Sequence, residues 1–144
     1  MNEKYEPLLL ENQVCFPLYA ATRELIKKCD VALSDIDLTY TQYVVMLVLW
    51  EKGNRTLKEL GEALYLDSGT LTPLLKRLES KGLITRTRLA SDERSLVIAP
   101  TKKGAALKDK ALSVPSTLSC SLCLSEKETQ TLRRLLYKIL ENAK

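Results

Sequence analysis

The sequence predicts a mostly helical chain with one small β-hairpin, and two observations support this class. Apolar residues recur at three- and four-residue spacing along most of the 144 residues, which is the periodicity of amphipathic helices. Two short segments, Leu83 to Arg88 and Ser95 to Ala99, instead alternate and are rich in β-branched residues, as strands are. The predicted order is therefore four helices, a hairpin and two further helices.

The first two helices are predicted from their periodicity and their ends. The first covers about Glu11 to Ala32, and its regular part should start close to Cys15, because Pro17 is tolerated best in a first turn. The second covers about Thr41 to Lys52. It is apolar almost all round and stops at Gly53, so we expect it to be buried.

The remaining helices carry recognisable capping residues. Thr56 to Glu59 is a capping box that opens a short helix to about Leu64, and Asp67 or Ser68 caps the next helix, which stops at Gly82. Thr101 should cap a helix through Leu112. Pro115 is expected in a break, and Ser125 to Glu128 forms a second capping box that opens a last helix to about Asn142.

Composition excludes several classes of protein. The longest apolar run, Tyr43 to Trp50, is far too short to cross a bilayer, and the polar N-terminus lacks a secretory pattern, so we expect a cytoplasmic chain. The absence of histidine excludes Cys–His and Ser–His catalysis. The net charge is +4, and residues 55–110 hold twelve Lys or Arg against seven Asp or Glu, so an anion partner should contact this stretch.

Two short helices followed at once by a basic hairpin are typical of a winged helix-turn-helix that reads double-stranded DNA. In such proteins the second helix enters the major groove with its N-terminal residues on base edges. The candidate DNA contacts are hydroxyls and cations of that helix and hairpin: Ser68, Thr70, Thr72, Lys76, Arg77, Arg86, Arg88 and Arg94. The lysines are equally explained as solubilising surface charge, and Asp92 as an ion-pair partner that holds Arg94 in position.

Four cysteines in a reducing compartment are candidates for redox chemistry. Cys15 lies near a helix start, where the helix dipole favours a thiolate, and the hydroxyls of Tyr19 and Tyr40 could donate hydrogen bonds to it. In one continuous helix Cys15 and Cys29 would lie about 21 Å apart, so they cannot pair within one chain. Cys120 or Cys123 could supply a resolving thiol. Cys29 is equally explained as a small buried apolar residue, and for Cys123 that explanation is favoured.

The segments LGEALYLDSGTLTPLLKRLESKGLITR and DERS resemble the MarR family of winged-helix regulators, and ENQVCFPLYAATRE and LTYTQY resemble its organic-hydroperoxide repressor (OhrR) branch. The resemblance runs from about Leu10 to Leu140. It implies one MarR-like domain over 1–144, in which residues 8–37 and 104–144 form a homodimer and residues 38–103 form the DNA-binding lobe. It also implies that Asp92 and Arg94 form the wing motif and that Arg94 enters the minor groove.

The same resemblance implies a role for each thiol. Cys15 corresponds to the peroxide sensor, which bonds to tyrosines of the other subunit, one of them matching Tyr40. Cys29 stands where many relatives have a second such tyrosine. Relatives with two cysteines carry the second near Cys120 and pair it with the sensor of the opposite subunit, which implies a disulfide between Cys15 and Cys120 of the partner subunit.

We therefore expect a homodimeric repressor of a palindromic operator, inactivated when an organic hydroperoxide oxidises Cys15, with no cofactor and no metal. One alternative is a repressor of the same fold that a phenolic or other aromatic ligand releases. A second is a thiol peroxidase, although nothing supplies the positioned arginine that such catalysis needs. A third is a metal-dependent regulator, since Cys120-Ser-Leu-Cys123 has ligand spacing but lacks a matching second pair.

Overall fold

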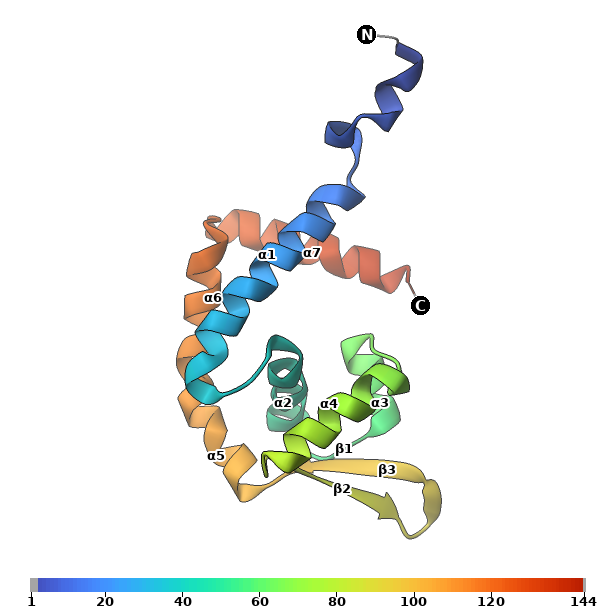
Figure 1. Cartoon of the computed structure of the whole chain (residues 1–144), viewed down its shortest axis with the longest axis vertical. Coiled ribbons are helices and arrows are strands. Elements are labelled where there is room, and N and C mark those ends of the chain that lie inside the picture. The colour runs from blue at the N-terminus through green and yellow to red at the C-terminus, as the bar shows by residue number, and fades with distance from the viewer. Residues whose placement is uncertain (1–2, 144) are drawn as a thin grey trace.

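The computed structural model describes residues 3–143 and confirms a mostly helical fold with a small antiparallel sheet (Figure 1). Its α-helices are α1 (Cys15–Leu33), α2 (Tyr40–Lys52), α3 (Leu57–Leu64), α4 (Ser68–Ser80), α5 (Lys102–Lys110), α6 (Val114–Leu122) and α7 (Glu126–Glu141). The strands are β1 (Arg55–Thr56), β2 (Ile84–Leu89) and β3 (Asp92–Pro100). Short 3-10 turns lie at Glu3–Leu8, Leu10–Asn12, Ser34–Ile36 and Ala111–Ser113.

Side-chain caps set the start of most helices. The capping boxes predicted at Thr56 and Ser125 are both present, each hydroxyl accepting from the third helical amide while the glutamate there accepts from the cap. Asp67, one of the two residues proposed for α4, is its cap, and Thr101 caps α5. Helix α1 begins at Cys15, which places Pro17 in the first turn as expected.

The break predicted at Pro115 is wrong. A 3-10 turn leads directly from α5 into α6, and Pro115 lies in the first turn of α6, where no backbone donor is required. Helix α6 instead ends at Cys123, whose backbone is left-handed with φ of 54°. The chain therefore has one more helix than its sequence pattern predicted.

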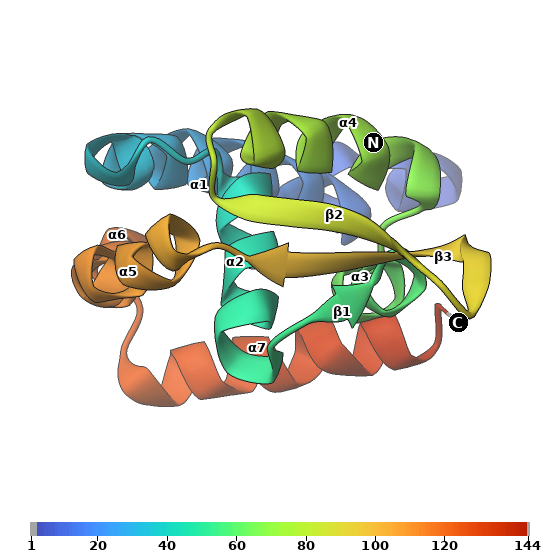
Figure 2. The same ribbon diagram turned by 90° about the horizontal axis from the view of Figure 1, so that it is seen from below.

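The sheet forms a wing at one end of the molecule. Its strand order is β1-β3-β2, and both neighbours are antiparallel to β3. Strand β1, which the sequence pattern did not predict, adds only the pairs Arg55 with Ile98 and Thr56 with Val97. Seen from below, α4 runs along one side of β2 while the turn between β2 and β3 projects outward (Figure 2).

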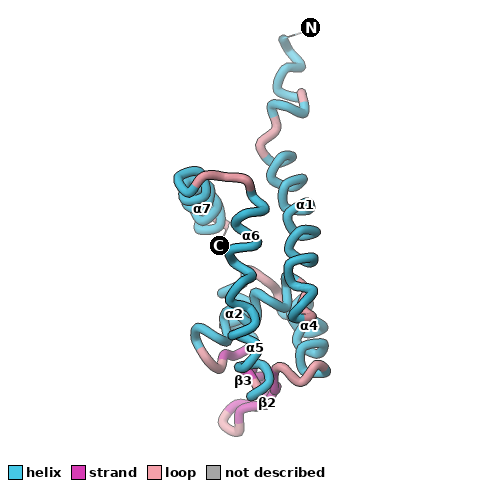
Figure 3. The backbone as a smooth tube through the Cα atoms, turned by 90° about the vertical axis from the view of Figure 1, so that its left-hand side faces the viewer, coloured by secondary structure: helices cyan, strands magenta, loops and turns pink. Residues whose placement is uncertain are grey.

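One apolar core joins α1, α2, α4 and the sheet. The inner leucines of α4 are buried, and Leu33 at the end of α1 and Met46 and Leu49 on α2 are 0–1% exposed. Helices α1 and α6 lie side by side above this lobe, and α7 lies on the side of α6 away from α1 (Figures 1 and 3). Among the described residues, no helix is both long and apolar enough to cross a bilayer.

Large apolar side chains stay exposed where α1, α7 and the N-terminal segment face away from the lobe. The N-terminal 3-10 turns project from the body in Figure 1, and α7 has no buried residue in spite of its amphipathic sequence. The exposed set includes Leu8, Leu10, Val14, Phe16, Leu18, Leu132, Leu135 and Ile139. Large apolar side chains exposed in such number are typical of a protein–protein interface.

Gly104 of α5 packs tightly against the backbone of Leu83, the residue before β2. A Cβ built at Gly104 would lie 2.0 Å from the carbonyl oxygen of Leu83, while its own carbonyl accepts from the indole of Trp50 at 2.8 Å. Alanine normally favours a helix over glycine, but here Gly104→Ala is expected to lower the free energy of unfolding by about 1–3 kcal/mol, because backbone must move. Urea unfolding measures this loss. The exposed Ala106→Ser should change it by less than about 0.5 kcal/mol, and a stabilised Gly104→Ala would contradict the contact.

Candidate functional site

The first turn of α4 is held rigidly by its cap. The Asp67 carboxylate accepts from the backbone amide of Thr70 at 2.7 Å and from its hydroxyl at 3.2 Å. These hydrogen bonds from Thr70 lower the pKa of Asp67 below its ordinary value. The turn therefore presents the exposed Ser68 in a fixed geometry at the open end of the helix.

The hydroxyls of Thr70 and Thr72 on α4 both donate hydrogen bonds within the chain. The Thr72 hydroxyl donates to the carbonyl of Ser68 at 2.7 Å, and the Thr70 hydroxyl donates to Asp67. Both hydroxyl protons are therefore used inside the helix, so the oxygens are left to accept. Lys76 and Arg77 lie exposed on the side of α4 opposite its buried leucines.

Arg86, one of the predicted DNA contacts, is engaged in an ion pair within the chain. Its Nε and one terminal nitrogen donate to the same Glu79 carboxylate oxygen at 2.9 and 2.6 Å, and only 21% of its side chain is exposed. This charged pair ties strand β2 to the end of α4. Arg86 therefore fixes the wing relative to the helix, while Arg88, further along β2, is exposed.

Asp92 organises the turn of the wing rather than pairing with the Arg94 guanidinium. One carboxylate oxygen accepts from the backbone amide of Arg94 at 3.0 Å, and the other accepts from the Ser95 hydroxyl at 2.7 Å. These two bonds, that from Ser95 first, lower the pKa of Asp92. The contact holds the backbone at the turn, and the Arg94 side chain is exposed.

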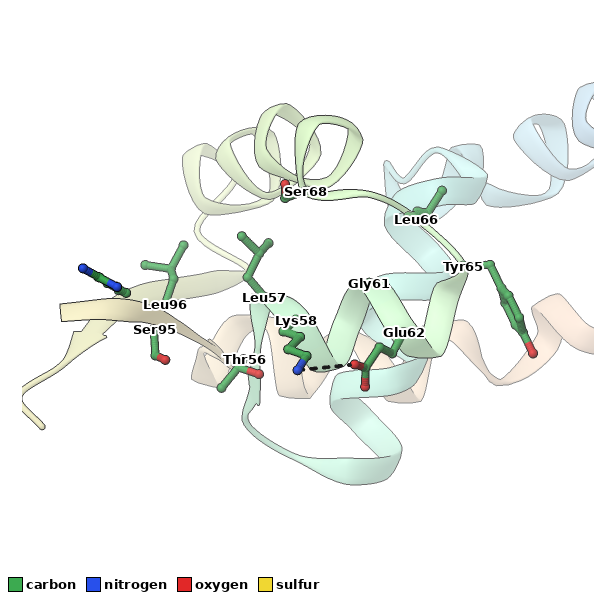
Figure 4. Close-up of a pocket in the computed structure, with 11 residues that line it drawn as sticks. Thr56, Leu57, Lys58, Gly61, Glu62, Tyr65, Leu66, Ser68, Ser95 and Leu96 are labelled. Carbon is green, nitrogen blue, oxygen red and sulfur yellow. Dashed lines mark ion pairs between the residues drawn. The ribbon is translucent and has the colours of Figure 1, made fainter. Parts of the chain in front are cut away.

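A groove of about 640 Å³ separates the wing from α3 and the start of α4 (Figure 4). Ser68 faces it from α4, Ser95 and Leu96 from β3, and Thr56 and Lys58 from the start of α3. Lys58 is only loosely paired with Glu62, at 3.9 Å, and both side chains are well exposed. Sequence reasoning missed Thr56, Lys58 and Ser95, because only the fold brings α3 next to the wing.

The candidate sensor thiol stands at the far end of α1 from the lobe. Cys15 is the first residue of the helix and is exposed, and the preceding Val14 supplies no side-chain cap to the first-turn amides. Tyr19 is one turn further, but its hydroxyl accepts from Arg23 at 3.4 Å. The Tyr40 backbone amide instead contacts Asp30, near the other end of α1. One chain therefore does not bring Cys15 and Tyr40 together.

Tyr40 lies beside Cys29 in a cavity of about 350 Å³ between α1, α2, α6 and α7. Burial raises the pKa of Tyr40, and Cys29 and then Tyr137 raise it further. The phenol therefore stays protonated and able to donate. Burial, followed by the charge of Asp30, also raises the pKa of Cys29, which disfavours its reactive thiolate.

The two C-terminal thiols are both accessible. Cys120 is exposed on α6, and Cys123 is exposed at the end of that helix, so the favoured interpretation of Cys123 as a buried apolar residue is wrong. Cys123 lies at the left-handed end of α6, and its thiol donates to the Cys120 carbonyl at 3.8 Å. Among residues 3–143, no group of three or more acidic or cysteine side chains is placed to hold a metal ion.

The cap of α4 gives a pH dependence with a defined sign. A carboxyl whose folded-state pKa lies below its unfolded value near 3.9 contributes stability above that value and loses it as pH falls through the lower pKa. We expect the melting temperature to fall as pH is lowered below about 4, and less steeply in Asp67→Asn, which can cap but cannot titrate. Thermal unfolding from pH 6 to 2.5 measures both slopes. Asp35→Asn, at an exposed carboxyl, is the control, and equal slopes in the wild type and Asp67→Asn would contradict the role of this cap.

The fold and the arrangement of α3, α4 and the wing define a winged helix-turn-helix transcriptional regulator. The family model "Transcriptional regulator SarA/Rot" matches residues 27–111. The chain is 48% identical over 141 residues to the organic hydroperoxide resistance transcriptional regulator of Bacillus subtilis, covering 98% of this chain and 96% of the relative. It therefore belongs to the MarR family of winged-helix regulators, in its organic-hydroperoxide branch.

Solved structures of AbfR, a protein of Staphylococcus epidermidis, show the same architecture. Reduced AbfR bound to DNA is 37% identical, with a TM-score of 0.79 over the whole of both chains. Disulfide-formed AbfR is 36% identical, with a TM-score of 0.61 over 99% of this chain and 94% of that one. The present conformation thus lies closer to the reduced, DNA-bound relative than to the disulfide form.

Proposed function

We propose that the chain is a homodimeric repressor that binds a palindromic double-stranded DNA operator and leaves it when Cys15 is oxidised by an organic hydroperoxide. The observation that carries this proposal is the shared exposed surface of the α4 start and the wing, which Asp67 and Asp92 hold in place on either side of one groove. No cofactor or metal is needed for this function.

The positions of the exposed side chains on α4 and the wing support DNA binding. Ser68 and the acceptor oxygens of Thr70 and Thr72 lie where a recognition helix meets base edges, with Lys76 and Arg77 further along it. Arg94, and with it Arg88, extends from the wing toward the flanking backbone and minor groove. Arg86 takes part only by holding the wing to α4.

A second copy of the chain would cover the exposed apolar side chains. Those on the N-terminal segment, α1 and α7 lie outside the lobe, which supports the assignment of 8–37 and 104–144 to dimerisation and of 38–103 to DNA binding. A two-fold dimer presents two copies of α4 and therefore fits two half-sites about 34–36 Å apart. The operator is then a palindrome.

The switch consists of two balanced thiol reactions. The Cys15 thiol attacks the peroxide O–O bond, which yields a sulfenic acid on Cys15 and releases the alcohol. The thiol of Cys120 of the partner subunit then displaces water from that sulfenic acid and forms a disulfide. Two equivalents of a small thiol restore both cysteines and leave as their own disulfide. The exposure of Cys15 and Cys120 supports this pairing, with Cys123 as the competing resolving thiol.

The proposed switch also assigns roles to the buried or partly buried residues Tyr40 and Cys29. Tyr40 stays protonated, so in a dimer it can donate to a thiolate of the other subunit, whereas the Tyr19 hydroxyl is shared with Arg23. Cys29 is buried with a raised pKa and so is a poor primary sensor. We infer a binding protein rather than an enzyme, acting in the cytoplasm, where its operator would be.

A ligand-released repressor remains the second candidate, because the lobe carries an aromatic cavity. It measures about 410 Å³ and is lined by Tyr43 and Trp50 on α2 and by the opposite charges of Glu51 and Lys108, a combination that suits an aromatic ligand with polar groups. If a phenolic carboxylate rather than a hydroperoxide releases DNA, a variant without Cys15 keeps its full response.

DNA binding measured by fluorescence anisotropy on the chain's own promoter fragment tests the proposal. Reduced protein should bind, and its affinity should fall at least about tenfold between 50 and 200 mM salt, because phosphate contacts release counterions. One equivalent of cumene hydroperoxide should then abolish binding, and dithiothreitol should restore it. Binding that survives oxidation would refute the switch, and no binding to any promoter fragment would refute the repressor.

A further inference from the structure

Helix α1 connects the candidate sensor thiol to the base of the DNA-binding lobe as one uninterrupted element. Cys15 is its first residue, and Leu33, its last, is 0% exposed in the core. Nineteen residues at about 1.5 Å each make a rod about 28 Å long. A displacement imposed at Cys15 therefore reaches the connection between α1 and α2.

At that connection, a lysine from the end of α4 is held by three oxygens. The Lys81 ammonium donates to the Asp37 backbone carbonyl, lies 3.2 Å from the Asp37 carboxylate and donates to the Gln42 side-chain oxygen at 3.3 Å. Lys81 directly follows α4, whereas Asp37 and Gln42 belong to the end of the α1 region and the start of α2. This is a polar bridge to residues 44 and 39 positions earlier in the sequence.

The groups in this bridge are not ordinary surface partners. Asp37 holds a left-handed backbone with φ of 51°, and Gln42 is only 4% exposed while its side chain also completes the cap of α2 through Thr39. The Lys81 side chain is only 29% exposed, whereas the Asp37 side chain is 89% exposed. Lys81 therefore lies against the protein rather than in solvent. Moving Asp37 thus breaks or drags two of the three contacts to one ammonium.

The same end of α4 is fixed to the rest of the lobe. Lys103 donates to the Lys81 carbonyl at 2.8 Å, Thr101 donates to the Gly82 carbonyl at 2.6 Å, and Glu79 pairs with Arg86. The start of α4 bears the exposed Ser68 and is capped by Asp67, and Leu71, one turn further along, packs in the core. Because α4 is 13 residues, about 20 Å, a tilt of about 10° at its anchored end moves Ser68 by about 3 Å. Hydrogen bonds to base edges do not survive a shift of that size.

We propose that Lys81 is a positioning residue that couples α1 to α4, so that displacement of the oxidised Cys15 end of α1 reorients the recognition helix through the Asp37–Lys81–Gln42 bridge. This inference rests on the proposed function and deepens it by assigning its route of transmission. It places the coupling at three side chains that belong neither to the thiol site nor to the proposed DNA contacts.

The test compares DNA affinity before and after oxidation in the full-length dimer. In Lys81→Met, which keeps the aliphatic stem, the ratio of oxidised to reduced Kd should fall at least about tenfold below the wild-type ratio, at equal Cys15 oxidation verified by mass spectrometry. Lys81→Arg should restore the ratio, and the exposed Lys110→Met should leave it unchanged. A merely structural lysine would lower the melting temperature and weaken both redox forms alike, so an unchanged ratio in Lys81→Met would overturn the coupling.

Amide hydrogen exchange separates this inference from the proposed function, because it needs no DNA. Oxidation of the wild type should change exchange in residues 75–82, and Lys81→Met should lose that change. Unaltered exchange there in the oxidised wild type would overturn the coupling on its own. If exchange changes as expected but DNA stays bound, the coupling stands and the redox repressor fails.

Discussion

Cys15→Ser is expected to bind operator DNA as tightly as the reduced wild type and to stay bound when hydroperoxide is added. In the wild type, one equivalent of organic hydroperoxide should weaken binding at least about 100-fold, because loss of two-fold docking returns the protein toward non-specific affinity. A serine hydroxyl cannot form a sulfenic acid, so its Kd should change less than about twofold. Anisotropy titrations with and without oxidant measure both ratios.

Two further variants identify the resolving thiol. Cys120→Ser should form no dithiothreitol-reversible linked dimer on a non-reducing gel, whereas Cys123→Ser should form one as the wild type does. Since both residues are exposed near the end of α6, they form a matched pair that differs by three positions. A linked dimer that persists in Cys120→Ser and disappears in Cys123→Ser would reverse the assignment. An equal response of the wild type and Cys15→Ser to peroxide would remove the thiol switch altogether.

Arg94→Ala should cause the largest loss of DNA affinity of any single change in the wing. The side chain is exposed while its backbone amide is fixed by Asp92, so the guanidinium starts from a preorganised turn. Each lost contact costs about 1–3 kcal/mol and a dimer loses two, so we expect Kd to rise at least about 30-fold. The salt dependence of binding should also become shallower, because fewer phosphate counterions are released.

Its controls separate the side chain from the turn. Asp92→Asn keeps an oxygen for the Arg94 amide and should cost much less than Arg94→Ala, whereas Lys110→Ala, an exposed cation at the end of α5, should bind as the wild type does. Unchanged melting temperatures would show that the fold is intact. If Arg94→Ala bound DNA as tightly as the wild type, the wing would not be a DNA contact.

Local signals in the sequence predicted most of the fold. The caps at Thr56, Thr101 and Ser125 each act through side chains within three or four residues, so the pattern alone sufficed. The break predicted at Pro115 was wrong because a proline disrupts the interior of a helix but is favoured in its first turn. The 3-10 turn before α6, which puts Pro115 in that first turn, has no recognisable sequence pattern. The two-residue strand β1 was missed because its pairing with β3 is entirely non-local.

The candidate site was predicted less completely, since side chains find partners that no spacing reveals. Arg86 was grouped with the other wing cations, yet seven positions earlier Glu79 reaches it across the end of α4. Cys123 was expected to be buried, but the left-handed end of α6 exposes it. The separation of Cys15 from Tyr40 within one chain shows why the thiol site could not be completed from a single subunit's pattern.

The Trp50 indole, which donates a hydrogen bond to the Gly104 carbonyl, is also an intrinsic fluorescent probe. Trp50 is the sole tryptophan, it contacts Tyr43 edge-on at 6.4 Å between ring centroids, and its indole nitrogen is bonded across to α5. Its emission therefore comes from a single place, the joint between the DNA-reading lobe and the helices that lead out of it. Ultraviolet fluorescence can follow movement at that joint in real time, in unlabelled protein and without a second chromophore.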